Sequence, residues 1–226
     1  TGTWLLSECF NFGGGLAMGL PGVASQFTTF SPLKTMGQIR AEGTTGALPL
    51  LPYSSMVCVG STFGTYGLLV DTPAIYLAQI PNIILGSYYC FEFARHAPKG
   101  ASTLPGTLGM HAAGVATVVT TVAGAALTLD KSTAVTTIGI IGDVLVVSMF
   151  GGPLVAIRTV LKEKSTRALP LPFTLASFTD TGLWTLYGTT VLMDPFIILP
   201  NSLGFFSSII QLGLHARFGG NPKPQS

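Results

Sequence analysis

The chain has 226 residues, of which 48% are hydrophobic and only 9% charged, whereas about a quarter of the residues of a typical soluble domain are charged. The mean hydropathy of +0.58, together with 28 Gly and 15 Pro, excludes an ordinary soluble fold and indicates an all-α membrane protein. The net charge of +2 is too small to indicate a nucleic-acid partner.

The chain has few residues of the types that carry out catalysis or bind metals. Cys9, Cys58 and Cys90 are odd in number and lie in or beside apolar stretches, which favours buried thiols over disulfides or a metal cluster. The chain contains no Ser/His/Asp set, no metal-ligand spacing and no phosphate-binding loop, so we expect neither an enzyme nor a cofactor or metal site. It opens at Thr1 without a basic segment, and no secretory signal is expected in it.

Seven stretches of the chain are long and apolar enough to cross a membrane as helices, which takes about 20 residues. In chain order they are residues 10–33, 47–70, 74–93, 103–129, 133–160, 168–193 and 196–217. Short loops join them. The polar composition of residues 219–226 predicts a disordered tail.

The basic residues of the predicted loops indicate an orientation. Ten of the 11 Lys and Arg residues fall on one side of the membrane, and only Lys131 falls on the other. Because cytoplasmic loops collect Lys and Arg, we expect an extracellular or lumenal N-terminus and a cytosolic C-terminus. Of the membranes that this allows, the plasma membrane is favoured over an internal one.

The second half of the chain repeats the first. At an offset of 121 residues, Ala-Leu-Pro-Leu at 47–50 aligns with the same four residues at 168–171. The further aligned pairs are Phe63 with Trp184, Tyr66-Gly67 with Tyr187-Gly188 and, at an offset of 119, Pro81-Asn82 with Pro200-Asn201. The first loop of each copy is basic, so the copies are parallel. The sequence therefore predicts two three-helix bundles, residues 1–100 and 131–218, joined by an inverting linker helix at 101–130.

Prolines occur at matching places in the two copies. Pro32 and Pro153 lie near the end of the first span of each copy, and the start of the second span has Pro49 and Pro52 in one copy and Pro170 and Pro172 in the other. A proline lacks the backbone N–H and clashes with the preceding turn, so we expect the helices to bend there. Such paired bends suit the hinges of a rocking transporter, although membrane helices also tolerate proline without this role.

Neutral polar and aromatic residues are the candidates for a binding site. Asn82 and Asn201 are repeat mates in apolar spans, and an amide offers the donors and acceptors that match the hydroxyls of a polyol; an interhelical hydrogen bond is the alternative. Phe63 and Trp184 offer flat faces for the C–H groups of a sugar ring, or simple packing.

An ordered series of motifs resembles the SWEET family of sugar facilitators over about residues 11–218. The motifs are Ser31-Pro32-Leu33, Pro52-Tyr53, Tyr66-Gly67, Pro153-Leu154 with Lys162, Lys164 and Ser165, Trp184 with Tyr187-Gly188, Asp194-Pro195-Phe196, and Pro200-Asn201. The resemblance implies seven spans in a 3-1-3 arrangement and bidirectional, energy-independent movement of a sugar by alternating access.

Roles for individual residues follow from this resemblance. Asn82, Asn201, Phe63 and Trp184 resemble the substrate-binding positions; Pro32, Pro52, Pro153 and Pro170 resemble the hinge prolines, although self-alignment pairs Pro170 with Pro49; and Tyr66, Tyr187 and Asp194 resemble outer-gate residues. Sucrose-handling members commonly have a smaller residue at position 63, so two large aromatic residues favour a monosaccharide such as glucose.

Two acids do not fit the family pattern. Asp143 and Asp180 lie within the fifth and sixth predicted spans, where a carboxyl group is costly and marks a candidate pathway residue or a hydrogen-bonded structural one. They favour a rival interpretation, a proton-coupled PQ-loop carrier of another solute such as an amino acid, although the chain contains no Pro-Gln dipeptide. A non-transporting receptor or scaffold also stays open. The expected partners are a small neutral sugar and the lipid bilayer, and a homo-oligomer is left open.

Overall fold

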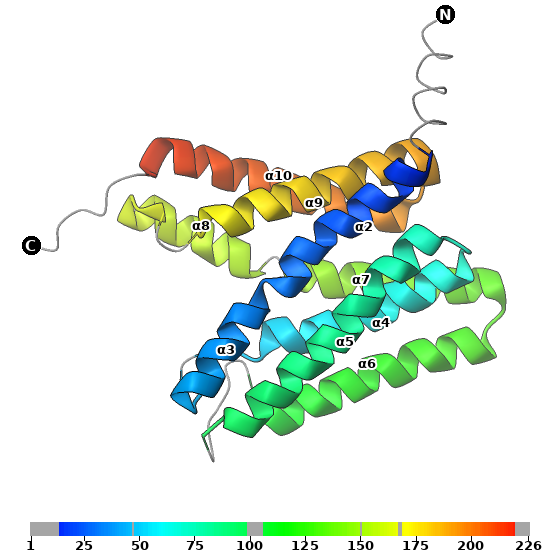
Figure 1. Ribbon diagram of the computed structural model, residues 1–226. Helices are drawn as coiled ribbons and strands as arrows, with labels where there is room; N and C mark the ends of the chain where they lie inside the picture. Colours follow the sequence, from blue (N-terminus) through cyan, green and yellow to red (C-terminus); the bar gives the residue numbers. More distant parts are fainter. Residues whose placement is uncertain (1–13, 47, 99–105, 150, 167–168, 220–226) are drawn as a thin grey trace, which may run out of the picture. The chain divides into compact units, whose positions relative to one another are not determined.

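The computed structural model describes residues 14–46, 48–98, 106–149, 151–166 and 169–219. These residues form nine α-helices and one π-helix and no strand (Figure 1). The helices are α2 (Gly14–Phe30), α3 (Pro32–Glu42), α4 (Leu51–Leu69), α5 (Pro73–His96), α6 (Leu108–Thr128), α7 (Lys131–Met149), α8 (Gly151–Glu163), α9 (Leu171–Tyr187), η2 (Gly188–Leu192) and α10 (Pro195–Phe218). Cys9, residues 10–13, 103–105 and 220–226, and the predicted span starts at 47 and 168 lie outside the described residues.

The helices correspond to the seven predicted spans. α4, α5, α6 and α10 each match one span, whereas α2 with α3, α7 with α8, and α9 with η2 share the other three. The first span was expected to end at residue 33, but α3 continues to Glu42. Its last turns are polar, so hydropathy alone does not predict them.

Within the described part of the chain, three stretches of helix are each long and apolar enough to cross a membrane: α6, the stretch of α7 and α8 from Lys131 to Glu163, and α10. At about 1.5 Å per residue, the 24 residues of α5 extend about 36 Å, more than the hydrocarbon core of about 30 Å. α4 and α9 are shorter, with 19 and 17 residues, and Ser, Thr, Tyr and Gly dilute their apolar surface.

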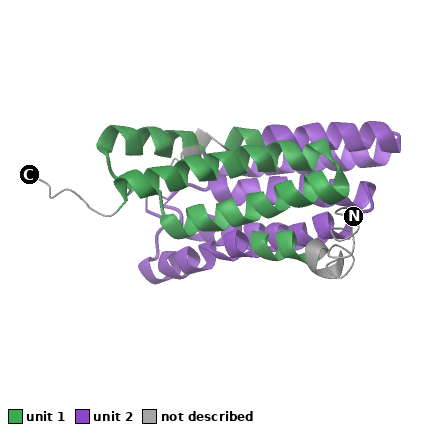
Figure 2. Ribbon diagram, turned by 90° about the horizontal axis from the view of Figure 1, so that it is seen from above, with its two compact units in different colours: residues 1–25, 146–226 green, residues 26–145 purple. Residues whose placement is uncertain are grey.

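The chain packs as two compact units, shown in different colours in Figure 2. One comprises residues 1–25 and 146–226, and the other residues 26–145. The boundaries between the units fall inside α2 and α7. This grouping follows packing rather than the sequence repeat, so the repeat boundaries stay a prediction.

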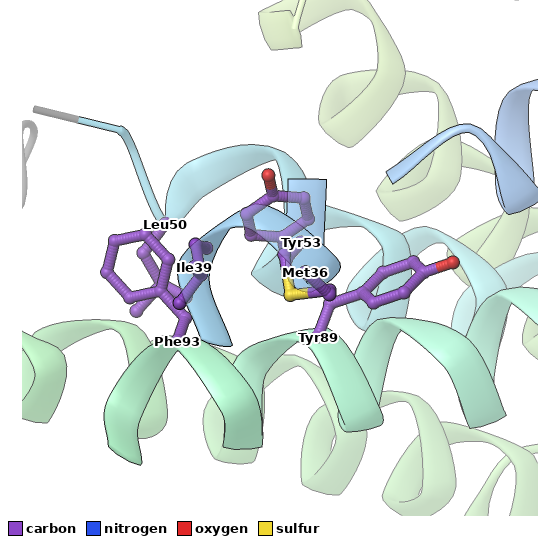
Figure 3. Packing of buried hydrophobic residues seen from close by; sticks show 6 residues of the cluster. All are labelled: Met36, Ile39, Leu50, Tyr53, Tyr89 and Phe93. Carbon is purple, nitrogen blue, oxygen red and sulfur yellow. The ribbon is translucent and has the colours of Figure 1, made fainter. Parts of the chain in front are cut away.

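The unit of residues 26–145 has a buried aromatic cluster where α3 packs against α4 and α5. Figure 3 shows its six members: Met36, Ile39, Leu50, Tyr53, Tyr89 and Phe93. The ring of Tyr53 meets Tyr89 edge-on at 5.7 Å between centroids and Phe93 at 6.2 Å. This burial attaches the short helix α3 to the two long helices.

Pro32 begins α3, and side chains donate hydrogen bonds to carbonyls of the turn before it. Proline has no N–H to donate to the carbonyl four residues earlier, which is that of Thr28. Ser31 Oγ donates to Thr28 O at 2.9 Å, and Tyr89 Oη donates to the next carbonyl, Thr29 O, at 3.0 Å. The helix is therefore interrupted at Ser31 without an uncompensated loss of hydrogen bonds.

The second helix of each repeat begins at prolines and does not bend at them. Pro52 and Pro172 are each the second residue of their helix, α4 and α9, while Pro170 directly precedes α9 and Pro49 lies outside α4. At a helix start the missing N–H costs nothing, because it would have no partner in the helix. The expected bends inside these two helices are therefore wrong, and the prolines mark helix starts instead.

The two Tyr-Gly motifs lie where a helix packs closely on the beginning of the next one. A Cβ added at Gly67 would lie 2.7 Å from the backbone nitrogen of Tyr76, and one at Gly188 would lie 3.2 Å from side-chain atoms of Ile197 and Ile198. The following turns both contain a residue with positive φ, Asp71 at 53° and Met193 at 50°. The repeated glycine thus permits a repeated tight connection.

We expect Gly67→Ala to destabilise the protein by about 1–3 kcal/mol, because a methyl group there overlaps rigid backbone. The thermal midpoint in detergent, read as the temperature that halves the monodisperse fraction, should fall by several degrees. Gly114→Ala in α6 is the matched control, since an added Cβ meets nothing within 4 Å there. Equal midpoints for both variants would show that the close approach at Gly67 is unimportant.

Candidate functional site

The structure brings each predicted aromatic site residue together with the predicted gate tyrosine three positions later. Phe63 and Tyr66 of α4 meet edge-on at 6.2 Å between centroids, with 74° between their planes. Trp184 and Tyr187 of α9 meet at 6.0 Å and 74°. All four side chains are buried. The repeat detected in the sequence is therefore a repeat of geometry, with one aromatic pair in each unit.

The two aromatic rings are held in different ways. Phe63 packs on Gly142 of α7, where an added Cβ would lie 2.8 Å from Phe63 Cζ, so the ring is positioned by shape. Trp184 is positioned by a hydrogen bond, since its Nε1 donates to Ser25 Oγ of α2 at 2.8 Å. The Phe63 ring thus contacts α7 in one unit, and the Trp184 ring contacts α2 in the other.

Asn82 of α5 is half-buried and hydrogen-bonded across helices. Thr29 Oγ1 of α2 donates to Asn82 Oδ1 at 2.6 Å, and Asn82 Nδ2 donates to Gln79 Oε1 at 2.9 Å. The interhelical bond considered as the alternative to substrate binding is thus present. These bonds use one of the two N–H donors of the amide.

Asn201 of α10 is half-buried and bonds only within its own helix among the described residues, where Nδ2 donates to Ile197 O at 2.8 Å. This bond also uses one of two N–H donors and leaves the amide oxygen for other donors. The two repeat mates therefore present different groups, with more of the hydrogen-bonding capacity of Asn201 unused.

Asp194, the third predicted gate residue, caps α10. Its Oδ1 accepts from the backbone N–H of Phe196 at 2.9 Å, a common arrangement for Asp at a helix start. It follows the π-helix η2 and the left-handed Met193. A π-helical turn is rare and occurs often at functional sites, which draws attention to this connection.

The two unexplained acids differ in their surroundings. Asp180 of α9 is half-buried and accepts a hydrogen bond from Ser25 Oγ at 2.7 Å. Asp143 of α7 is half-buried and follows Gly142, the residue on which Phe63 packs. Among the described residues, no group of three His, Cys, Asp or Glu could hold a metal ion.

The structure has an ion pair between a buried Glu and an exposed Arg that the sequence pattern does not predict. Glu92 of α5 is 8% exposed, and its Oε2 lies 3.3 Å from Arg40 Nε of α3. The guanidinium of Arg40 also lies over the ring of Tyr88 at 5.5 Å. The sequence contained one signal for Glu92. It lies ten residues after Asn82, and the buried Gln211 lies ten residues after Asn201, the repeat mate of Asn82.

The structure also has an apolar groove of about 680 Å³ between α4, α5 and α6. It is lined by residues such as Val57, Cys90 and Val115, and by none of the predicted site residues. His111 also lines it and forms a hydrogen bond through Nδ1 with Ser54 Oγ at 2.9 Å. This groove is therefore separate from the candidate binding residues.

A protein-family model described as "Sugar efflux transporter for intercellular exchange" matches the chain twice, at residues 17–101 and 136–223. The two matches coincide closely with the two predicted repeats.

Similar curated proteins carry names from the same family. The chain is 31% identical to "Sugar transporter SWEET1" of Caenorhabditis elegans over 78% of its length, and spans 56% of that relative. It is 29% identical to "Bidirectional sugar transporter SWEET16" of Arabidopsis thaliana over 87% of its length and 85% of the relative. These names denote transporters and not enzymes.

The fold is similar to that of a solved eukaryotic SWEET transporter. The match has a TM-score of 0.80 at 21% identity and covers 94% of this chain and 100% of the other. This match confirms the all-α membrane fold expected from the sequence, and the family-model match confirms the expected family resemblance.

Proposed function

The chain belongs to the family of sugar efflux transporters for intercellular exchange, and on this premise we propose that it is a bidirectional facilitative transporter of a small neutral sugar. A monosaccharide such as glucose is the proposed substrate. Movement occurs by alternating access and without an ion gradient. The sugar binds at Asn82, Asn201, Phe63 and Trp184.

The observation that carries this proposal is the repeated combination of amide and aromatic groups. Each repeat supplies one Asn with an unused N–H donor and one buried aromatic ring paired edge-on with a Tyr. Hydroxyl groups of a sugar exchange hydrogen bonds with amides, and its C–H faces pack on aromatic rings. None of these four groups is charged, which suits an uncharged substrate.

The hinge proposal is supported by the way the first helix is interrupted. Since Ser31 and Tyr89 supply the hydrogen bonds at the break, α2 and α3 can change their mutual angle without exposing carbonyls to lipid. Pro32, Pro52, Pro153 and Pro170 all lie at or within three residues of a helix start. Hinges usually occupy such element-terminal positions.

The gate and the orientation complete the proposal. Tyr66, Tyr187 and Asp194 form the outer gate, at the ends of α4 and α9 and the start of α10. The loop charges support an N-terminus outside the cell or in a lumen and a C-terminus in the cytosol. The plasma membrane is the proposed location.

The rival function is a proton-coupled carrier, and Asp143 and Asp180 are the observations in its favour. An acid within a membrane helix is a frequent proton carrier. Asp180, however, has a hydrogen-bonding partner in Ser25, which gives this carboxylate a structural task. A non-transporting scaffold is disfavoured by two retained sets of sugar-compatible groups.

We expect Asn82→Ala and Asn201→Ala each to reduce radiolabelled glucose flux in proteoliposomes about tenfold, since the loss of a hydrogen bond in a desolvated site costs about 1 kcal/mol or more. Thr120→Ala is the control for reconstitution, because this exposed hydroxyl bonds only to its own helix.

Thr29→Val separates binding from structure at Asn82. This variant removes the donor to Asn82 Oδ1 but keeps the amide. If Asn82 binds the sugar, Thr29→Val should retain most of the flux. A Thr29→Val variant as inactive as Asn82→Ala, or normal flux in both Asn variants, would refute the site assignment.

The size of Phe63 predicts the substrate preference. Because this ring is buried between Tyr66 and Gly142, little space remains for a second sugar ring. In one vesicle preparation, glucose uptake should exceed sucrose uptake about tenfold, the order expected for about 1.4 kcal/mol of steric discrimination. Phe63→Val should reduce that ratio, and a native protein that prefers sucrose would contradict the monosaccharide proposal.

A further inference from the structure

We infer that Asp180 and Ser25 are positioning residues that fix the orientation of the Trp184 indole. This inference assigns a role to the acid that the family resemblance leaves unexplained. Its consequence for transport rests on the proposed function, whereas its geometric part does not. The three residues lie in the same compact unit, formed by residues 1–25 and 146–226.

The contacts form a continuous chain of hydrogen bonds. Trp184 Nε1 donates to Ser25 Oγ at 2.8 Å, and Ser25 Oγ donates to Asp180 Oδ1 at 2.7 Å. The indole N–H only donates, and the serine hydroxyl has a single hydrogen. The hydrogen bonds therefore run from the indole N–H through the serine hydroxyl to the carboxylate. Pro21 O lies 3.1 Å from the same hydroxyl as a second, more distant acceptor.

Burial gives this chain its strength. Trp184 is 7% exposed and Ser25 8% exposed, so water does not compete for their polar atoms. A serine that accepts from Trp184 has to donate its hydrogen elsewhere, and a charged acceptor forms the stronger bond. Asp180 lies four residues before Trp184 in α9, one helical turn away, and hence on a similar face.

The other repeat shows why the acid occurs only once. The repeat mate of Trp184 is Phe63, which has no N–H, and the residue at the position of Asp180 is Val59. Phe63 is held by its contact with Gly142 instead. A polar support is thus present where the ring has a polar atom and absent where it does not. This correlation favours a positioning role over proton transfer.

An orienting role requires a hydrogen-bond acceptor at position 180, and this acceptor does not need to be titratable. Asp180→Asn keeps an oxygen that accepts from Ser25, so it should preserve the indole. Asp180→Leu removes this acceptor from the Ser25 hydroxyl. Ser25→Ala removes the hydroxyl to which the indole donates and should have the larger effect.

The first measurement needs no sugar. The chain has two tryptophans, Trp4 and Trp184, so a Trp4→Phe background leaves Trp184 as the sole indole. The ultraviolet resonance Raman band that reports indole N–H hydrogen bonding is recorded for full-length protein in proteoliposomes. Ser25→Ala should shift the band towards a free N–H, Asp180→Leu should shift it less, and Asp180→Asn should leave it unchanged.

The second measurement is glucose transport by the same variants. The apparent KM should rise about tenfold for Ser25→Ala and several-fold for Asp180→Leu, with maximal rates within about twofold of native, because about one hydrogen bond of orientation is lost. Asp180→Asn should retain the native KM. The matched control is Thr179→Ala, since this neighbouring exposed hydroxyl bonds only to Leu175 O of its own helix.

The outcomes separate the two proposals. An unshifted Raman band in Ser25→Ala, or a shifted band with unchanged KM, would overturn the positioning role. An Asp180→Asn variant as impaired as Asp180→Leu would overturn it as well, because the charge itself would then matter. If the native protein carries no glucose, the proposed function fails, and the Raman series still decides whether Ser25 and Asp180 position the indole.

Discussion

The whole arrangement depends on one constraint of the bilayer, that every backbone N–H and C=O in it needs a partner inside the protein. Prolines lack a backbone N–H and therefore remove hydrogen bonds at defined places. Near Pro32, Ser31 and Tyr89 donate hydrogen bonds to the carbonyls of Thr28 and Thr29. At the starts of α4 and α9 no hydrogen bond is lost, because Pro52 and Pro172 lie where the helix needs no N–H donor. These prolines therefore lie at helix starts where the hydrogen-bond requirement of the bilayer is met.

The two repeats share local geometry at their Tyr-Gly motifs and differ in side-chain support. Both have an aromatic residue followed by a tyrosine at the same angle, and a glycine at the tight connection to the next helix. Yet Phe63 is positioned by packing on Gly142, whereas Trp184 is positioned by a hydrogen-bonded serine. A sugar ring is itself asymmetric, with different hydroxyls at each edge. Two repeats with unequal aromatic side chains would suit the proposed substrate.

Much of this was predictable from the sequence, because hydropathy and a fixed offset are local signals. They predicted the seven spans, and they aligned Phe63 with Trp184, each of which meets the tyrosine three residues later edge-on. They missed the continuation of α3 to Glu42, because its Lys34, Gln38 and Arg40 end the apolar signal while burial of Met36 and Ile39 continues the helix. They also missed the bond between Ser25 and Asp180, whose positions are 155 residues apart. Only the tertiary fold joins such residues.

The central claim is that the substrate passes by neutral groups alone, so that the protein equilibrates a sugar and does not pump it. The most direct test is glucose distribution across proteoliposomes containing native protein under an imposed pH gradient. The account predicts that glucose enters until its concentrations inside and outside are equal, with an initial rate that does not change when the gradient is reversed or collapsed. Accumulation of glucose above the outside concentration, abolished by collapse of the gradient, would contradict it.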